Sequence, residues 1–87
     1  MSEAAGASPH GIPLSSIKVG ECCEVVFIRS QSRARRERLG AYGIIPGSRL
    51  VLHQKRPAFV IRVGETDLAL DEELAREILV RRMKPEH

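Results

Sequence analysis

The stretch LGAYGIIPGSRL, residues 39–50, decides how this chain folds. Gly43 follows a run that suits a helix, and glycine readily takes the left-handed conformation that ends one. Pro46 and Gly47 predict a tight turn, because proline fixes φ at one position and glycine accepts a positive φ at the next. Residues 49–55 then alternate as a strand does. A helix that passes so abruptly into a strand predicts a small β-barrel with a helix at one end.

Upstream of this stretch, the sequence predicts a helical turn, a strand and the start of the helix. Residues 13–17 form the turn, and residues 22–29 the first strand. The helix is capped by Ser30 or Ser32 and runs to about Tyr42. Three alternating apolar residues of the strand are expected to point into the core: Cys23, Val25 and Phe27.

The helix has a short apolar side and a long charged side. Leu39 and Tyr42 are expected to pack inward. Three charged residues are expected to lie outside: Arg33, Arg36 and Glu37. The Tyr42 ring would fill a core position while its hydroxyl reaches solvent or a partner.

Downstream of the turn, the chain predicts further short strands and a second helix. The predicted elements are strands at 48–55, 58–63 and 66–70, a helix over 72–78 capped by Asp71, and a strand at 79–82. Gly64 and Glu65 suit a type II′ hairpin, which needs glycine first. The fold class is therefore mainly β: a small five-stranded barrel with a short helical insertion after the first strand and a short helix before the last. Residues 1–12 are expected to be a disordered lead-in, 13–83 the barrel domain, and 84–87 a tail.

Charge and cysteine usage narrow the class of protein. The 87 residues carry a net charge of +3, and eleven of the fourteen basic residues are arginine, which favours forked recognition of carboxylates or phosphates. The adjacent pair Cys22 and Cys23 is not suited to a disulfide, which fits a reducing compartment. The chain shows neither a signal peptide nor a membrane-length apolar run. We therefore expect a cytoplasmic protein that reaches a membrane only through a partner.

No motif in the chain indicates catalysis. The sequence lacks a P-loop, a GxSxG elbow, an HExxH helix and a CxxC pair, and its three histidines lie far apart. Catalysis needs a base held near a nucleophile, so we expect a non-enzymatic protein. Cys22, Cys23 and His53 offer soft ligands to a transition metal, but adjacent strand residues point to opposite faces. No cofactor is therefore assigned, and this metal site stays an alternative.

The cluster of basic residues near the helix has three interpretations: a solvated face, a docking surface for an acidic protein, or a phosphate-binding surface. Its five members lie within ten residues: Arg29, Arg33, Arg35, Arg36 and Arg38. Against nucleic acid, the strands lack the aromatic residues on which bases stack, and several glutamates interrupt the positive charge. Nucleic acid is not the expected partner. A homodimer stays an alternative, because strand edges and Val60 are expected to be exposed.

Two motifs resemble the FeoA family. RRERLGAYGIIPGSRL is similar to the family pattern RRLxxLGIxPGxxV, and LALDEELAREILV to LALRxxxAxxIxV. The resemblance covers about residues 14–82. It implies an SH3-like five-stranded barrel and a small cytosolic accessory protein of bacterial ferrous iron uptake that acts on FeoB, a transporter with a cytosolic GTP-binding domain. It also implies kinship with the SH3-like modules of iron-dependent metalloregulators. The connection at residues 54–58 is shorter than the family's, and Tyr42 stands where leucine is usual.

The leading hypothesis is thus an interaction module that binds the cytosolic part of a FeoB-like transporter. The contact residues we expect lie on the helix and the turn: Arg35, Arg36, Tyr42, Ile45, Pro46 and Gly47. The alternatives are a metal-sensing regulatory module and a nucleic-acid-binding small barrel.

Overall fold

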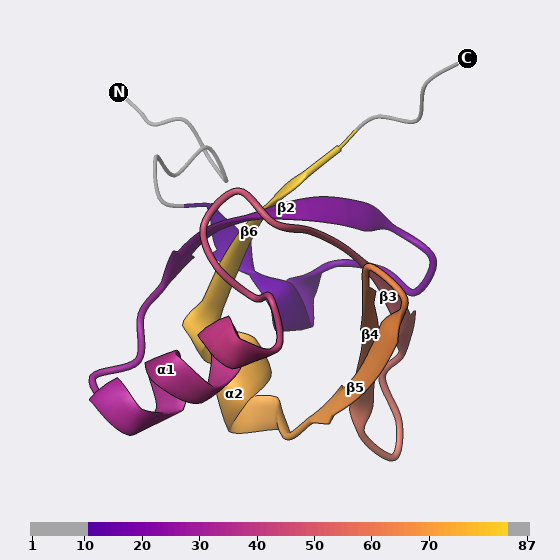
Figure 1. The fold of residues 1–87 in the computed structure, drawn as a ribbon. Helices are drawn as coiled ribbons and strands as arrows, with labels where there is room; N and C mark the ends of the chain where they lie inside the picture. The colour runs from indigo at the N-terminus through magenta and orange to yellow at the C-terminus, as the bar shows by residue number, and fades with distance from the viewer. Residues whose placement is uncertain (1–10, 84–87) are drawn as a thin grey trace, which may run out of the picture.

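The computed structural model describes residues 11–83 as a curved antiparallel sheet with two short α-helices and a 3₁₀ turn (Figure 1). The elements in chain order are β1 (Ile12–Pro13), η1 (Leu14–Ser16), β2 (Cys22–Ile28), α1 (Arg33–Ala41), β3 (Arg49–Gln54), β4 (Phe59–Val63), β5 (Thr66–Leu70), α2 (Glu72–Glu77) and β6 (Ile78–Arg82). The expected tail, and nearly all of the expected lead-in, lie outside the described residues.

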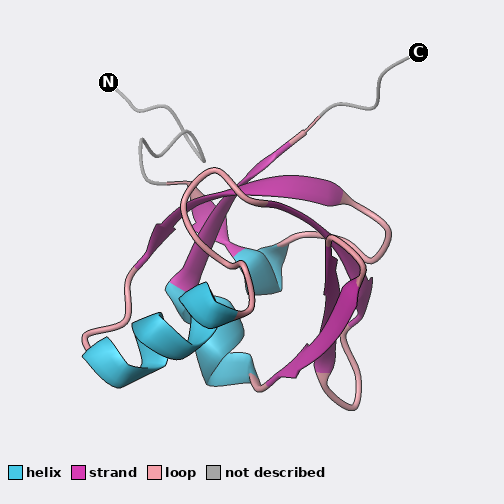
Figure 2. Cartoon of the chain, viewed as in Figure 1, coloured by secondary structure: helices cyan, strands magenta, loops and turns pink. Residues whose placement is uncertain are grey.

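The strands form one sheet in the order β1-β6-β2-β3-β4-β5, and every neighbouring pair is antiparallel. Figure 2 shows the strands curving around a common interior with the helices against one side. The mainly β class and the order of elements are confirmed, but the described part of the chain has six strands, and five were predicted. The additional one is β1, in which Ile12 pairs with Val80 and Pro13 with Leu79. Two residues are too few to show an alternating pattern, and the predicted boundary at residue 13 cuts through this strand.

The core lies inside the curved sheet and is aliphatic, apart from Cys23 and Phe59. Leu14 and Ile17 are fully buried at the two ends of the η1 turn, as predicted. Leu50 and Leu52 of β3 and Ile61 of β4 point inward. The β4–β5 hairpin is closed by Gly64 and Glu65, and only Gly64 has a positive φ, at 62°, which is the type II′ pattern.

The prediction for Phe27 is wrong. Its side chain is 47% exposed, whereas Ile28 is 9% exposed and belongs to the core. The reason is a β-bulge: the pairing of β2 with β6 shifts register between Val25 and Phe27. An extra residue in one strand reverses the faces of the residues that follow it, so strict alternation holds only as far as Val25.

Candidate functional site

Helix α1 carries most of the predicted contact residues and is held at its start by two serines. The Ser32 hydroxyl accepts a hydrogen bond from the Arg35 N–H at 3.1 Å, as an N-cap does. The buried Ser30 hydroxyl accepts one from the Ser32 N–H at 3.1 Å. Of the nine helical residues, only Leu39 is buried. The sheet therefore holds α1 through one apolar anchor, and polar contacts supply the rest.

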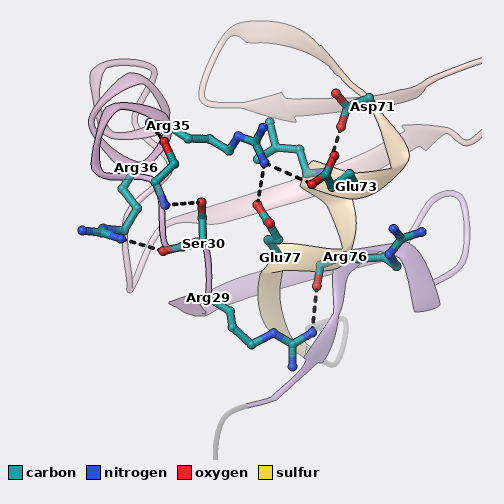
Figure 3. Close-up of polar contacts among 10 residues, drawn as sticks. Arg29, Ser30, Arg35, Arg36, Asp71, Glu73, Arg76 and Glu77 are labelled. Carbon is teal, nitrogen blue, oxygen red and sulfur yellow. Dashed lines mark hydrogen bonds and ion pairs between the residues drawn. The ribbon is translucent and has the colours of Figure 1, made fainter.

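Arg35 joins α1 to α2. Its Nη1 lies 3.1 Å from Glu77 Oε1 and 3.7 Å from Glu73 Oε2, and both carboxylates come from α2 (Figure 3). The hydrogen bond to Glu77, together with that charge, raises the pKa of the Arg35 guanidinium. Arg35 is thus already engaged within the chain, and its ion pairs connect two elements that are distant in the sequence.

Other basic residues of the cluster are engaged in the same way. Arg36 Nη1 donates to the Ser30 carbonyl at 2.6 Å, and Arg33 pairs with Glu37 at 3.0 Å. Arg29 Nη2 donates to the carbonyl of Arg76 at 3.4 Å. Arg38 differs, because it has neither an ion pair nor a side-chain hydrogen bond within residues 11–83. This internal pairing weakens the continuous basic surface that nucleic-acid binding requires.

The turn after α1 is tied to strand β2. Gly43 has a φ of +91° and Gly47 a φ of +96°, so both predictions of left-handed glycine are confirmed. The Gly47 N–H donates to the Val25 carbonyl at 2.7 Å, and the Val25 N–H donates to the Ser48 carbonyl at 2.7 Å. The Ser48 N–H closes the turn on the Ile45 carbonyl at 2.9 Å. Both the helix end and the turn are therefore held in fixed positions.

Two large apolar side chains point away from this rigid segment. Tyr42 is 51% exposed and Ile45 is 52% exposed. The expectation that Tyr42 packs inward is wrong. Helix α1 ends at Ala41, and Tyr42 at the C-cap no longer has the backbone conformation of the helix. Ile44, which sequence analysis did not single out, is fully buried next to it. The change of direction at Gly43 thus places one isoleucine in the core and the next on the surface.

The predicted contact residues fall into two groups. Arg35 and Arg36 lie near the start of α1, and Tyr42 lies seven residues later, about 10 Å along a helix. Ile45 and the exposed residues Pro46 and Gly47 continue from Tyr42. Of the second group, Tyr42 lines a groove of about 320 Å³ that sequence analysis missed. Its walls come from three elements: Arg38, Leu39, Tyr42, Leu68, Ala69, Leu70, Asp71 and Leu74. The only sequence signal for it was the apolar spacing of residues 68, 70 and 74.

The candidate metal ligands are not brought together as a set. Cys23 is fully buried, and burial raises the pKa of its thiol to about 12, which disfavours the thiolate that a metal needs. Cys22 is exposed and pairs with Val51, two residues before the exposed His53. Within residues 11–83, no group of three metal-binding side chains occurs. In the same range, no helix is long and apolar enough to cross a membrane.

Comparison with known proteins gives a consistent result. The family model of the FeoA domain matches residues 12–82. A crystal structure of an iron uptake regulatory protein, FeoA, is 28% identical with a TM-score of 0.74, and the match covers 83% of this chain and 96% of that one. A FeoA-like protein from Clostridium acetobutylicum is 25% identical with a TM-score of 0.75, covering 92% and 95%.

A third structure shares the fold. FeoA from Stenotrophomonas maltophilia, in complex with zinc, is 22% identical with a TM-score of 0.72, covering 82% of this chain and 91% of that one. It is described as a prokaryotic SH3 domain protein with a proposed role as a ferrous iron transport activating factor. Among curated proteins, none matches this chain. The family match spans nearly all of the described residues, and the chain therefore belongs to the FeoA domain family.

Proposed function

We propose that this chain is a cytosolic, non-enzymatic accessory protein of ferrous iron uptake that binds the cytosolic part of a FeoB-type transporter. Membership of the FeoA domain family supports a role in ferrous iron transport. The observation that carries the binding role is the pair of exposed apolar side chains, Tyr42 and Ile45, on a turn that is hydrogen-bonded to the sheet.

The physical argument rests on rigidity and exposure. Tyrosine is enriched among the residues that dominate binding energy at interfaces. Side chains on a preorganised segment lose little conformational freedom when a partner covers them. The turn at residues 45–48 is fixed by backbone hydrogen bonds to Val25, and the Tyr42 N–H donates to the Leu39 carbonyl at 3.0 Å, so both side chains extend from fixed backbone. Pro46 and Gly47 complete the surface, and Arg35 and Arg36 lie at its margin, where their side chains are already engaged within the chain.

The arginines have a second role within that surface. Arg35 is held by Glu73 and Glu77, and Arg36 by Ser30, so replacing either also changes contacts inside the chain. A variant of Arg35 and Arg36 therefore does not separate binding from folding. Tyr42 and Ile45 offer the cleaner test, because they are exposed by about half and their removal opens no large cavity.

The experiment measures the affinity of the purified 87-residue chain for the cytosolic GTP-binding domain of the transporter by calorimetry. The double variant Tyr42→Ala with Ile45→Ser is expected to bind at least about tenfold more weakly, which is typical for the loss of a central aromatic contact. The matched control is Val19→Ser, an apolar residue 56% exposed in the turn before β2. If the wild type does not bind, or the double variant binds as well as the control, the proposal fails.

A further inference from the structure

The last strand of the sheet has an open edge. Within residues 11–83, strand β5 pairs only with β4, and the register joins Val63 to Thr66, Arg62 to Asp67 and Val60 to Ala69. The pair that closes a two-residue hairpin is hydrogen-bonded, and hydrogen-bonded pairs alternate with the other kind. Asp67 and Ala69 therefore direct their backbone N–H and C=O groups away from β4. Within residues 11–83, no turn, loop or side-chain hydrogen bond takes up these groups.

The apolar groove lies beside this edge. The C-terminal half of β5 forms its wall on one side. Leu39 of α1 and the C-cap residue Tyr42 form the other, and Leu74 of α2 lies between them. Figure 1 shows α2 between α1 and β5 in the same way. Leu68 and Leu74 are only partly buried against the core, so they present apolar surface to the groove. Its volume of about 320 Å³ is at the lower limit for ligand pockets and suits a few side chains.

One cation on the groove is not neutralised within the described chain. The side chain of Arg38 is exposed and without an ion pair, whereas Arg33 and Arg35 of the same helix are both paired with glutamates. The carboxylates beside the groove are already engaged. Asp67 accepts two hydrogen bonds from Arg62, at 2.9 and 3.3 Å, and Asp71 accepts the Leu74 N–H at 2.8 Å. The hydrogen bond to Asp71 leaves its negative charge in place, so a carboxylate of an occupant would pair with the guanidinium of Arg38 on the α1 side of the groove and not beside Asp71.

We propose that an extended segment of the transporter's cytosolic part adds to the open edge of β5 as a further strand. This inference rests on the proposed function and names the kind of segment that binds. Its backbone pairs with Asp67 and Ala69, its apolar side chains enter the groove beside Tyr42 and Leu68, and an acidic side chain reaches Arg38. Strand addition of this kind takes affinity from main-chain hydrogen bonds and specificity from alternate side chains.

A polypeptide fits the site better than other occupants. Only a peptide backbone supplies donors and acceptors at the spacing of an open strand edge. A second copy of this chain is less suited, because two copies each carry a net charge of +3 and Asp67, the acidic residue of β5, is held by Arg62. The occupant is therefore expected to come from a partner with an acidic, alternately apolar segment.

Amide hydrogen exchange tests the pairing directly. In the ¹⁵N-labelled chain bound to the transporter's cytosolic domain, the amides of Asp67 and Ala69 are expected to exchange at least about tenfold more slowly than in the free chain. Leu68, whose N–H faces β4, is the internal control and is expected to change less. Binding without protection of Asp67 and Ala69 overturns strand addition and leaves the proposed function standing. Absence of binding overturns both.

Variants test the contacts of the segment. Arg38→Glu is expected to weaken binding at least about tenfold. The control is Arg56→Glu, which makes an equal charge change in the β3–β4 loop and is expected to change the affinity little. Arg56 is exposed and has no ion pair in the described structure. Ala69→Pro removes the outward N–H without removing a hydrogen bond to β4. Edge strands tolerate proline at such a position. Equal affinities for Arg38→Glu and Arg56→Glu contradict the proposal. The proposal is also contradicted if the amides of Asp67 and Ala69 are protected from exchange without the transporter domain and the chain then has twice its molecular mass. A second copy of the chain would in that case be the occupant.

Discussion

The two ends of helix α1 serve different purposes. At its start, Arg35 and Arg36 are bound to Glu77 and to the Ser30 carbonyl, so their charges hold the helix on the rest of the chain. At its end, Tyr42 and Ile45 expose about half of their apolar surface from a segment that is itself well fixed. The arginines at the start of α1 therefore make internal contacts, whereas the exposed apolar turn is the surface left for a partner.

The largest expected effect separates the buried anchor of α1 from the exposed turn. Leu39→Ala removes the only buried side chain of the helix and is expected to lower the free energy of unfolding by about 2–5 kcal/mol. Ile45→Ala, at a residue 52% exposed, is expected to cost less than about 0.5 kcal/mol. Urea denaturation of both variants measures the difference. Equal losses of unfolding free energy would mean that Ile45 is part of the core, and the two ends of α1 would then not differ in role.

A smaller effect distinguishes two of the three glycines of the same segment, Gly40 and Gly47. Gly47 has a φ of +96°, so Gly47→Ala is expected to destabilise by about 1–2 kcal/mol although a Cβ there meets nothing within 4 Å. Gly40 lies inside α1, and a Cβ there would make an ordinary contact of 3.7 Å with Ile45. Gly40→Ala is expected to stabilise by about 0.5–1 kcal/mol. Thermal unfolding gives both values, and opposite signs are the signature of a segment that needs glycine where φ is positive, as at residue 47, and not inside the helix.

The smallest expected effect comes from the ion pair at the start of α1. A double-mutant cycle with Arg35→Gln and Glu77→Gln is expected to show a favourable coupling in the melting temperature, smaller than the change from Gly47→Ala. The coupling should disappear in 1 M salt, because partly exposed charges are screened. A second cycle with Arg33→Gln and Glu37→Gln, at a more exposed pair, is the control and should show a smaller coupling. A coupling that does not change with salt would contradict an electrostatic contact.

Local sequence signals predicted most of the fold. Glycines with positive φ, the serine and aspartate caps and the hairpin at Gly64 each depend on a few neighbouring residues, and those signals are visible without a structure. Phe27 was misplaced because a bulge depends on how β2 pairs with β6, which is a long-range property. The strand β1 was missed for the same reason, since its only support is the pairing of Ile12 and Pro13 with β6.

The candidate site was predicted only in part. The segment around Tyr42 and Ile45 was singled out from the sequence, but its exposed faces depend on where α1 ends and how Gly43 turns the chain. The internal partners of Arg35 come from α2, about forty residues away, and no local pattern indicates them. The groove beside β5 is also formed by three distant elements. Contacts between distant elements are therefore the information that the sequence alone did not supply.

A titration of the ¹⁵N-labelled chain with the transporter's cytosolic GTP-binding domain tests the central claim most directly. The account predicts that the largest amide shift changes occur at Tyr42, Ile45 and Gly47, while residues 33–36 at the start of α1 change little. Changes centred on residues 33–36, with the turn at 45–48 unaffected, would show that the arginines are the contact surface and would contradict the account.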